Sequence, residues 1–440
     1  MSTAAPTTKT KTIDINVRHV TRLEGHGNIV VRAKDGVIEK NEWQVPEAPR
    51  FFEAMVRGRS FEDIQTVVSR ICGICSVTHS FGALKAIEDA MDIEVSAQTS
   101  MLRLLTHYGE QLESHALHVG YLVAPDLLNQ KSVVPLAASH EDLVKTVVAI
   151  HRVGNLVMEK IGGRKTHPIR LLPGGFSMLP SEADLRELMH ELEDTIPRLE
   201  TLAAAIADLA GGLPSFERET EYVALVNPPT YPFYEGQIGS TDLDTSTPVA
   251  DFESVVNEYV HPQSTAKWCK WHRESYAVGA LARYNLNADY LQPLAAGAAN
   301  SFGLKKGVCN PFLNNVAQVV ECFQVVERSL QLIDVLLSTG ITQERPRVSP
   351  KAGVGVGAVE APRGILFHKY EFDEDGICTR ANLCIPTNQN HANIQLDFEA
   401  FVPQIIDRDQ DEVRHLMEML VRSYDPCISC STHYLNVEFV

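Results

Sequence analysis

Apolar and polar residues alternate near the beginning of the chain, which is the pattern of strands with one buried face. A first strand is predicted over residues 13–17 and a second over 28–33. Asp35-Gly36 then forms a hairpin turn into a third strand over 37–45. A small antiparallel sheet is therefore expected within an N-terminal β region, residues 12–50.

Apolar residues further along recur at the three- and four-residue spacing of amphipathic helices. Long helices are expected over residues 96–123, 139–161, 181–211, 315–338 and 409–423. A shorter helix begins at the capping box Ser60-Phe-Glu-Asp63 and runs into Cys72. Pro197 is expected to kink the third long helix, because proline lacks an N–H. Stripes of this length are typical of helices that form the core of a bundle.

Two segments lack this periodicity. Residues 213–310 are richer in Pro, Tyr and Asn and predict an irregular, partly β insertion. Residues 350–433 predict a β-rich region, with tight glycine turns between 352 and 400, that continues into the expected helix over 409–423 and ends in a C-terminal metal motif. We therefore expect one domain over residues 1–440, of the α+β class and mainly α. Its central bundle of long helices would come from residues 60–212 and 315–340, flanked by the small N-terminal sheet and the β-containing C-terminal region.

The composition indicates a soluble globular protein, with 44% hydrophobic and 22% charged residues. The 39 basic and 56 acidic residues give a net charge of −17, which disfavours nucleic acid or an anionic membrane as partner. The N-terminus has no apolar segment of signal-peptide length, and no run approaches the roughly 18 apolar residues that span a bilayer. We expect a cytoplasmic protein without a membrane span.

The nine cysteines are an odd number and do not suit a disulfide framework in a long cytoplasmic chain. Four of them form two Cys-x-x-Cys pairs at opposite ends of the chain, Cys72/Cys75 and Cys427/Cys430. Four soft sulfur ligands are enough to hold a thiophilic metal. The other five stand singly and are expected to be buried structural thiols: Cys269, Cys309, Cys322, Cys378 and Cys384.

Spacing alone leaves three interpretations of the pairs. A closed zinc site is the most common use of paired Cys-x-x-Cys, although such sites usually join loops that are close in sequence. A redox dithiol needs only one pair and a thioredoxin-like βαβ context, which is not predicted here. A catalytic metal centre with open positions predicts polar residues and proton-handling groups close by.

The residues around the pairs extend both motifs. Arg70-Ile-Cys-Gly-Ile-Cys75 with His79, and Asp425-Pro-Cys-x-x-Cys430 with His433, resemble the signature motifs of the large subunit of [NiFe] hydrogenases. Further elements fall in that family's order: Arg22-x-Glu-Gly-His26, Arg50-Phe-Phe-Glu53, His115-x-x-His118, Gly162-Gly-Arg164 with His167-Pro168, Glu360-Ala-Pro-Arg-Gly364 and Pro386-Thr387. The resemblance covers about residues 13–433 and implies the hydrogenase large-subunit fold.

The resemblance implies a nickel–iron centre that catalyses the reversible, heterolytic cleavage of H2. All four cysteines would bind nickel, and Cys75 and Cys430 would also bridge to an iron that carries CO and two cyanide ligands. Cys72 and Cys427 would be terminal ligands, and thiolates suit nickel in this role. Cys427 would take the proton and pass it to the Glu24 carboxylate.

Other site residues follow from the same resemblance. Arg363 would donate to one cyanide and Thr387 to the other, with Asp425 as the counter-charge of Arg363. Pro362 would pack the pocket of the diatomic ligands. His79 would hydrogen-bond the sulfur of Cys75. Glu53 and His433, with the carbonyl of Leu383, would hold Mg2+ or Fe2+ near the C-terminus. Without the resemblance, Glu24 would be interpreted as a loop cap, Arg363 as a surface turn residue and Thr387 as a strand hydroxyl. His115, His118 and His167 are expected to be buried, hydrogen-bonded histidines.

The single cysteines do not have the spacing of an iron–sulfur ligand set. Iron–sulfur clusters are therefore expected only in an obligate small partner subunit. The resemblance also implies further electron-transfer subunits with flavin, nickel-insertion proteins and a maturation protease that removes residues 434–440 after His433.

One departure points to a branch of the family. Many membrane-associated hydrogenases have an Asp just before the first His of the His-x-x-His element, where this chain has Ser114, preceded by Glu113. This run and Val123-Ala-Pro-Asp126 resemble the soluble cytoplasmic branch, which exchanges electrons with NAD(P), deazaflavin or heterodisulfide-reductase partners. Two alternatives remain: the homologous quinone-site subunit of respiratory complex I, which lacks the four cysteines, and a structural four-cysteine zinc protein.

Overall fold

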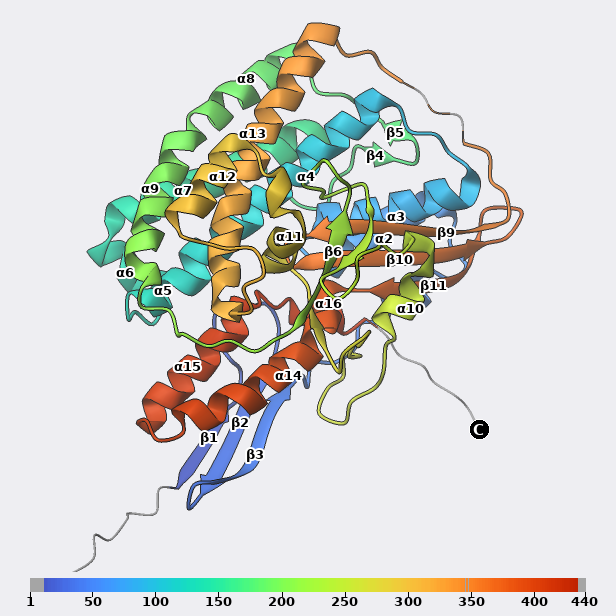
Figure 1. Ribbon diagram of the computed structural model, residues 1–440. Coiled ribbons are helices and arrows are strands. Elements are labelled where there is room, and N and C mark those ends of the chain that lie inside the picture. The colour runs from blue at the N-terminus through green and yellow to red at the C-terminus, as the bar shows by residue number, and fades with distance from the viewer. Residues whose placement is uncertain (1–11, 345, 347, 434–440) are drawn as a thin grey trace, which may run out of the picture.

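A three-stranded antiparallel sheet opens the chain in the computed structural model, which describes residues 12–344, 346 and 348–433 (Figure 1). Its strands are β1 (Ile13–Val17), β2 (Asn28–Lys34) and β3 (Val37–Gln44), in the order β1-β2-β3. Asp35 (φ 52°) and Gly36 (φ 78°) both have the left-handed backbone that a two-residue hairpin turn of this kind requires. The predicted N-terminal sheet is confirmed.

Long helices form the centre of the molecule, as predicted. Four expected ranges correspond to α4 (Ala97–Leu117), α7 (Glu141–Gly162), α8 (Glu182–Glu193) with α9 (Thr195–Ala210), and α13 (Asn314–Thr339). Helix α3 (Ser76–Met91), which follows the first cysteine pair, was not among the expected helices. Figure 1 shows α7, α8, α9 and α13 together on one side of the molecule. Helices α4 and α7 approach closely at two glycines: a Cβ on Gly154 would lie 2.6 Å from the backbone nitrogen of Glu113, and one on Gly109 would lie 2.9 Å from the Gly154 carbonyl oxygen.

Two predicted helix features differ in detail. The expected helix over residues 181–211 is two helices that meet at Asp194, because the Pro197 ring and its missing N–H disrupt the turn before it. Ser181 and Asp184 form a capping box at the start of α8. Ser60 caps α2 (Phe61–Val68) through the N–H of Glu62 at 3.4 Å, so the reciprocal capping box expected there is wrong.

The middle insertion is only partly as predicted. Its β part is a sheet of β6 (Glu221–Val226), β7 (Gln237–Ser240) and β8 (Tyr276–Ala277), in the order β7-β6-β8. Residues 280–301 are helical instead, as α11 (Ala280–Asn287) and α12 (Pro293–Ser301). Buried polar residues such as Arg283 and Asn287 interrupt the apolar stripe of α11, which conceals it from a periodicity test.

The C-terminal region begins with the predicted β structure. Strands β9 (Gly353–Ala361), β10 (Gly364–Phe372) and β11 (Cys378–Cys384) form an antiparallel sheet in the order β11-β10-β9. Glycines 353, 355 and 357 let β9 lie directly against α3, because a Cβ at each would overlap a backbone carbonyl oxygen of that helix. The sheet and α3 together support the first cysteine pair.

The β-rich prediction fails for residues 386–405, which form the helix α14, Pro386–Ile405. The helix expected over 409–423 is confirmed as α15 (Gln410–Ser423), and the short α16 (Ile428–Ser431) follows it. Helix α14 buries polar residues on every side, including Asn388, Gln389 and Asn390, so it has no polar face to mark it as amphipathic. In Figure 1, α14 and α15 lie between the helical body and the N-terminal sheet.

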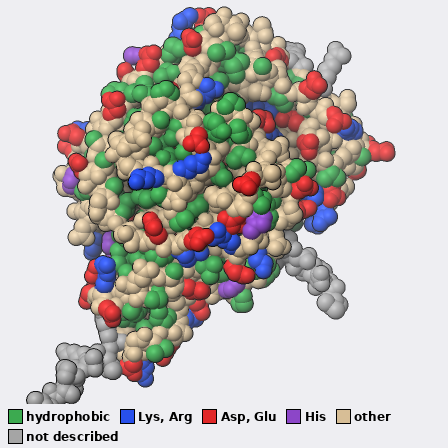
Figure 2. Space-filling model, in the orientation of Figure 1, with side chains coloured by type: hydrophobic (Ala, Val, Ile, Leu, Met, Phe, Trp, Pro, Cys, Tyr) green, Lys and Arg blue, Asp and Glu red, His purple; other side chains and the backbone are tan. Residues whose placement is uncertain are grey.

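Short elements complete the described chain: α1 (Phe52–Val56), α5 (Ala124–Leu127), α6 (Val133–Ser139), α10 (Phe252–Val256), β4 (Leu171–Leu172) and β5 (Gly175–Phe176). A π-helical turn, His118–Val123, continues α4. Among the helices of the described residues, none is long and apolar enough to cross a membrane. Acidic and basic side chains are interspersed over the face in Figure 2, so neither sign forms a continuous patch there.

Candidate metal centre

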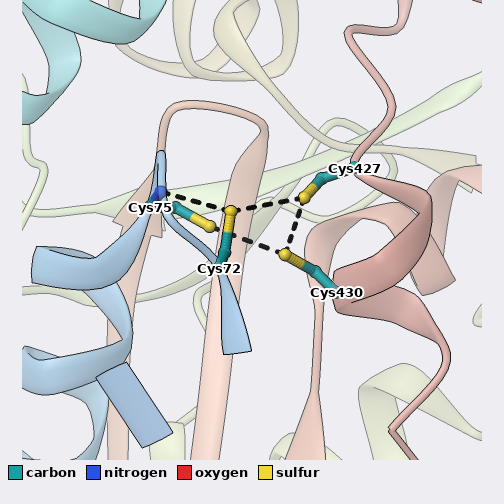
Figure 3. Close-up of side chains that lie close together, drawn as sticks. All are labelled: Cys72, Cys75, Cys427 and Cys430. Atoms are coloured by element: carbon teal, nitrogen blue, oxygen red, sulfur yellow. Dashed lines mark hydrogen bonds between the residues drawn. The ribbon is translucent and has the colours of Figure 1, made fainter. Parts of the chain in front are cut away.

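The two cysteine pairs meet in the interior of the fold (Figure 3). Cys72 follows a short 3-10 turn after α2, Cys75 precedes α3, and Cys427 and Cys430 come from the start of α16. The sulfurs of Cys72 and Cys427 are 3.6 Å apart and those of Cys75 and Cys430 are 3.7 Å apart. All four are buried and lie within 4.8 Å of one another, which is the arrangement of a single metal-binding group.

Backbone groups and one arginine fix the two motifs. The N–H groups of Ile74 and Cys75 donate to the sulfur of Cys72, at 3.3 and 3.5 Å. The Arg50 guanidinium donates to the Ile71 carbonyl at 2.7 Å and also to the Ser429 carbonyl, so it joins the first motif to the second. The sequence marked Arg50 only as part of a motif, and this linking contact could not be foreseen.

The thiols have unequal acidities. Burial raises the pKa of Cys427 and of Cys430 well above the usual range of a thiol. Hydrogen bonds from Cys427 and its neighbours lower the pKa of Cys72 well below that range. A cation among the sulfurs would allow all four to ionise, because it offsets both burial and mutual repulsion.

The Glu24 carboxylate lies beside this cluster. Its Oε2 is 3.2 Å from the Cys427 sulfur and accepts the N–H of Ser429 at 3.0 Å, while its carbonyl accepts the Ile428 N–H at 2.9 Å. Gly25 (φ 86°) makes this approach feasible, since a Cβ there would lie 2.6 Å from the Cβ of Ile428. Glu24 is thus in direct contact with a cysteine, and the same carboxylate also caps the backbone at Ser429.

Arg363, Asp425 and Thr387 surround the same cluster. Arg363 is buried and donates through Nε to the Asp425 carbonyl at 2.7 Å and through Nη2 to its carboxylate at 2.9 Å. Its Nη1 is buried without a hydrogen-bond partner in the described chain. Thr387, in the first turn of α14, accepts the Cys427 N–H at 3.0 Å, which leaves its hydroxyl hydrogen to be donated. Arg363 is therefore not a surface residue, and Thr387 is not on a strand.

Two further predicted residues are buried nearby. His79 lies in α3 with Nδ1 at 3.2 Å from Nε2 of His368, so only its Nε2 could make the predicted bond to Cys75. Burial lowers the pKa of His79 to about 3, which keeps the ring neutral. Pro362 precedes Arg363, and its carbonyl accepts from the guanidinium of Arg283 at 3.1 Å.

Glu53, Leu383 and His433 come together as predicted. Nε2 of His433 lies 2.7 Å from the Leu383 carbonyl oxygen and 3.5 Å from Oε1 of Glu53. The same Glu53 oxygen accepts the Leu383 N–H at 2.8 Å. Neighbouring ligands of an octahedral Mg2+ are about 3 Å apart, a value that lies between the 2.7 and 3.5 Å from His433 to the other two groups. The tail, residues 434–440, lies outside the described residues.

Both histidines of the His-x-x-His element are buried and hydrogen-bonded, as predicted. His115 bonds Glu321 at 2.8 Å, and His118 bonds Gln318 at 2.6 Å and the Arg422 carbonyl at 2.7 Å. His167 bonds the Ser69 carbonyl at 2.8 Å but is only half-buried, so the burial expected for it is wrong. Glu113 bonds His151 at 2.8 Å, on the α7 side of α4.

Some contributors to the site gave no sequence signal. Glu110, on α4, accepts the N–H groups of Val77 and Thr78 at 2.6 and 3.0 Å and so caps the helix that begins after Cys75. Gln318 donates to Asp425 at 3.1 Å and thereby orients the partner of Arg363. Both are polar residues within apolar helices, and only tertiary packing gives them these contacts.

The five single cysteines are not alike. Cys322 and Cys378 are buried, as expected, whereas Cys309 is half-buried. Cys269 and Cys384 are buried as well, but their sulfurs lie only 4.0 Å apart.

Comparison with known proteins gives matches over nearly the whole chain. Sulfhydrogenase 2 subunit alpha of Pyrococcus furiosus is 30% identical, covering 96% of this chain and 100% of that protein. NAD-reducing hydrogenase HoxS subunit beta of Cupriavidus necator is 28% identical, covering 95% and 94%. The solved structure of an NAD+-reducing [NiFe]-hydrogenase superposes with a TM-score of 0.86 at 27% identity, covering 96% and 99%. The [NiFeSe]-hydrogenase of Dm. baculatum, 21% identical with a TM-score of 0.77, shares the fold.

The profile of one family matches as well. The nickel-dependent hydrogenase family matches residues 50–161 and 229–433, which include both cysteine pairs, Arg363 and His433. The family implies a nickel–iron centre, and the four converging sulfurs are a suitable ligand set for it. The chain belongs to the nickel-dependent hydrogenase family, as a homologue of the large subunits that act on H2.

Proposed function

We propose that this chain is the catalytic subunit of a soluble, cytoplasmic [NiFe] hydrogenase and that Cys427 and Glu24 carry the proton of its reaction. The observation that supports this most directly is the 3.2 Å contact between the Cys427 sulfur and Oε2 of Glu24, beside a buried four-sulfur cluster. A proton on that sulfur could reach the carboxylate without an intervening water. A zinc protein or a complex I-like subunit would not need this contact.

The residues fit a nickel–iron group. Cys72, Cys75, Cys427 and Cys430 would hold the nickel, and Cys75 and Cys430 would also be ligands to the iron. When bound, the group would supply the site at which H2 is cleaved heterolytically. The buried, unpartnered Nη1 of Arg363 and the free hydroxyl hydrogen of Thr387 are suitable donors to two cyanide ligands.

The surrounding residues position these groups. Asp425 accepts two bonds from Arg363 and so fixes the guanidinium plane. Pro362 would shape the pocket of the diatomic ligands, and neutral His79 would donate to the sulfur of Cys75. Glu53, His433 and the Leu383 carbonyl would hold Mg2+ or Fe2+ and anchor the end of α16.

The electrons would leave through a partner. The described residues contain two groups that could hold a metal: the four cysteines, and Glu258 with Cys269 and Cys384. If the four cysteines hold nickel, the other group has only two cysteines, whereas an iron–sulfur cluster usually takes four. We infer that an iron–sulfur small subunit accepts the electrons, with flavin-containing subunits and a soluble acceptor beyond it. The two relatives described above are named as an alpha and a beta subunit, which agrees with such an assembly.

Exchange between H2 and D2O tests the proton role in the purified complex. Glu24→Gln keeps the size and an acceptor for the Ser429 N–H but cannot take up a proton. We expect nickel content to stay at the wild-type level and exchange to fall about a hundredfold or more, since general acid–base catalysis contributes about 10²–10⁴-fold. Wild-type exchange by Glu24→Gln would refute the role of Glu24.

A further inference from the structure

A second metal-binding group lies apart from the nickel ligands. It consists of Glu258, Cys269 and Cys384, whose ligand atoms all lie within 4.8 Å of one another. The two cysteines are buried completely, with their sulfurs 4.0 Å apart. They belong to a small apolar cluster between β6, α10 and β10, whereas the four nickel-site cysteines belong to the main core.

The fold brings these three residues together by two separate means. Tyr259 and Trp268 form an antiparallel bridge, with both N–H···O bonds at 2.8 Å. The next residues outward, Glu258 and Cys269, therefore stand opposite each other across the bridge. Cys384 is the last residue of β11 and approaches the pair from the C-terminal sheet.

The spacing of the sulfurs suits a shared cation. Two thiolates at 2.3 Å from a tetrahedral Zn2+ are about 3.8 Å apart, close to the observed 4.0 Å. A disulfide would instead require about 2.05 Å between the sulfurs. The geometry therefore matches two ligands of one tetrahedral ion better than it matches a crosslink.

The glutamate supplies the third ligand atom. Oε2 of Glu258 pairs with the Lys267 ammonium, while Oε1 is buried and lacks a hydrogen-bond partner within the described part of the chain. A buried, unpaired carboxylate oxygen is costly, and coordination of a cation would satisfy it. Two thiolates and this carboxylate carry three negative charges, which a divalent cation and the Lys267 ammonium would offset.

We propose that Glu258, Cys269 and Cys384 bind a thiophilic divalent cation, Zn2+, distinct from the nickel–iron centre. Zn2+ accepts sulfur and carboxylate ligands together and takes four of them, so the fourth position is left for a water molecule. The site crosslinks the segment 258–269 to the end of β11. Leu383 precedes Cys384 and bonds both Glu53 and His433, so the cation also stabilises the strand end beneath the C-terminal motif.

The site is tested by measuring zinc and nickel in the hydrogenase complex purified from cells grown with added Zn2+. We expect Cys269→Ala to lose one zinc per chain relative to wild type, with the nickel content unchanged. Glu258→Gln should release the same zinc to a chelator at least tenfold faster than wild type does. Cys322→Ala, at a buried single cysteine on α13, is the matched control and should retain all zinc.

Equal zinc contents in wild type, Cys269→Ala and Cys322→Ala would overturn the proposal. If Cys269→Ala does not assemble, anomalous scattering at the zinc edge from wild-type crystals decides instead. We expect a peak about 2.3 Å from the sulfurs of both Cys269 and Cys384. No zinc peak there, or a disulfide between these residues, would refute the site.

Discussion

Arg50 joins the two cysteine motifs, so its removal should open the C-terminal motif selectively. The guanidinium donates to the carbonyl of Ile71 in the first motif and to that of Ser429 in the second. Arg50→Met keeps most of the side-chain length and removes both donors. Hydrogen bonds to charged groups contribute about 1.5–3 kcal/mol each, and because Arg50 is only half-buried we take the lower value. The expected loss is therefore about 3 kcal/mol.

Hydrogen–deuterium exchange of the peptide spanning residues 427–433 measures this loss. A local opening energy lowered by about 3 kcal/mol raises the exchange rate about a hundredfold. Arg59→Met is the matched control, because Arg59 is exposed and donates to a carbonyl of its own segment, that of Met55. It should leave exchange at 427–433 unchanged. The reasoning is wrong if Arg50→Met exchanges at the wild-type rate, or if Arg59→Met has the same effect.

Two further substitutions test the packing and the buried titratable groups. Gly355→Ala should lower Tm, by the equivalent of about 1–3 kcal/mol, because the new Cβ overlaps the Ala86 carbonyl oxygen. The control Gly297→Ala, in α12, places its Cβ in open space and should not lower Tm. Burial lowers the pKa of His391 to about 3 from 6.5, so the unfolded chain binds more protons and stability falls as pH drops below about 6.5. Between pH 7.5 and pH 5.5, Tm should fall less in His391→Gln than in the wild type, by the equivalent of about 1 kcal/mol. An equal fall in both proteins would contradict this.

The elements that the sequence predicted correctly have local causes. The hairpin at Asp35-Gly36 follows from two left-handed residues, and the stripe of α7 follows from a helix that buries only its apolar face. Helices α4 and α13 also bury polar residues, but each is long enough for its apolar residues to recur at helical spacing. Helices α11 and α14 were missed because their polar residues are buried and paired with distant partners. Asn390, for example, bonds the backbone of Val278 at 2.9 and 3.2 Å.

The candidate site, like the fold, was predictable from the sequence only in part. The resemblance identified Glu24, Arg363, Asp425 and Thr387. In the structure Glu24 and Thr387 contact Cys427, and Arg363 pairs with Asp425, two residues before Cys427. Spacing alone favours a closed zinc site over a catalytic metal centre. Contacts such as that of Arg50 with Ser429, or of Cys269 with Cys384, join segments far apart in sequence and depend on the folded topology.

Infrared spectroscopy with nickel analysis of the purified complex tests the central claim most directly. If the four cysteines hold a nickel–iron group, the wild-type protein should contain one nickel per chain and show the stretching bands of one CO and two cyanides. Cys430→Ser should lose both the nickel and the bands, whereas Cys322→Ala should keep them. Zinc in the four-cysteine site without these bands, or bands that persist in Cys430→Ser, would contradict the account.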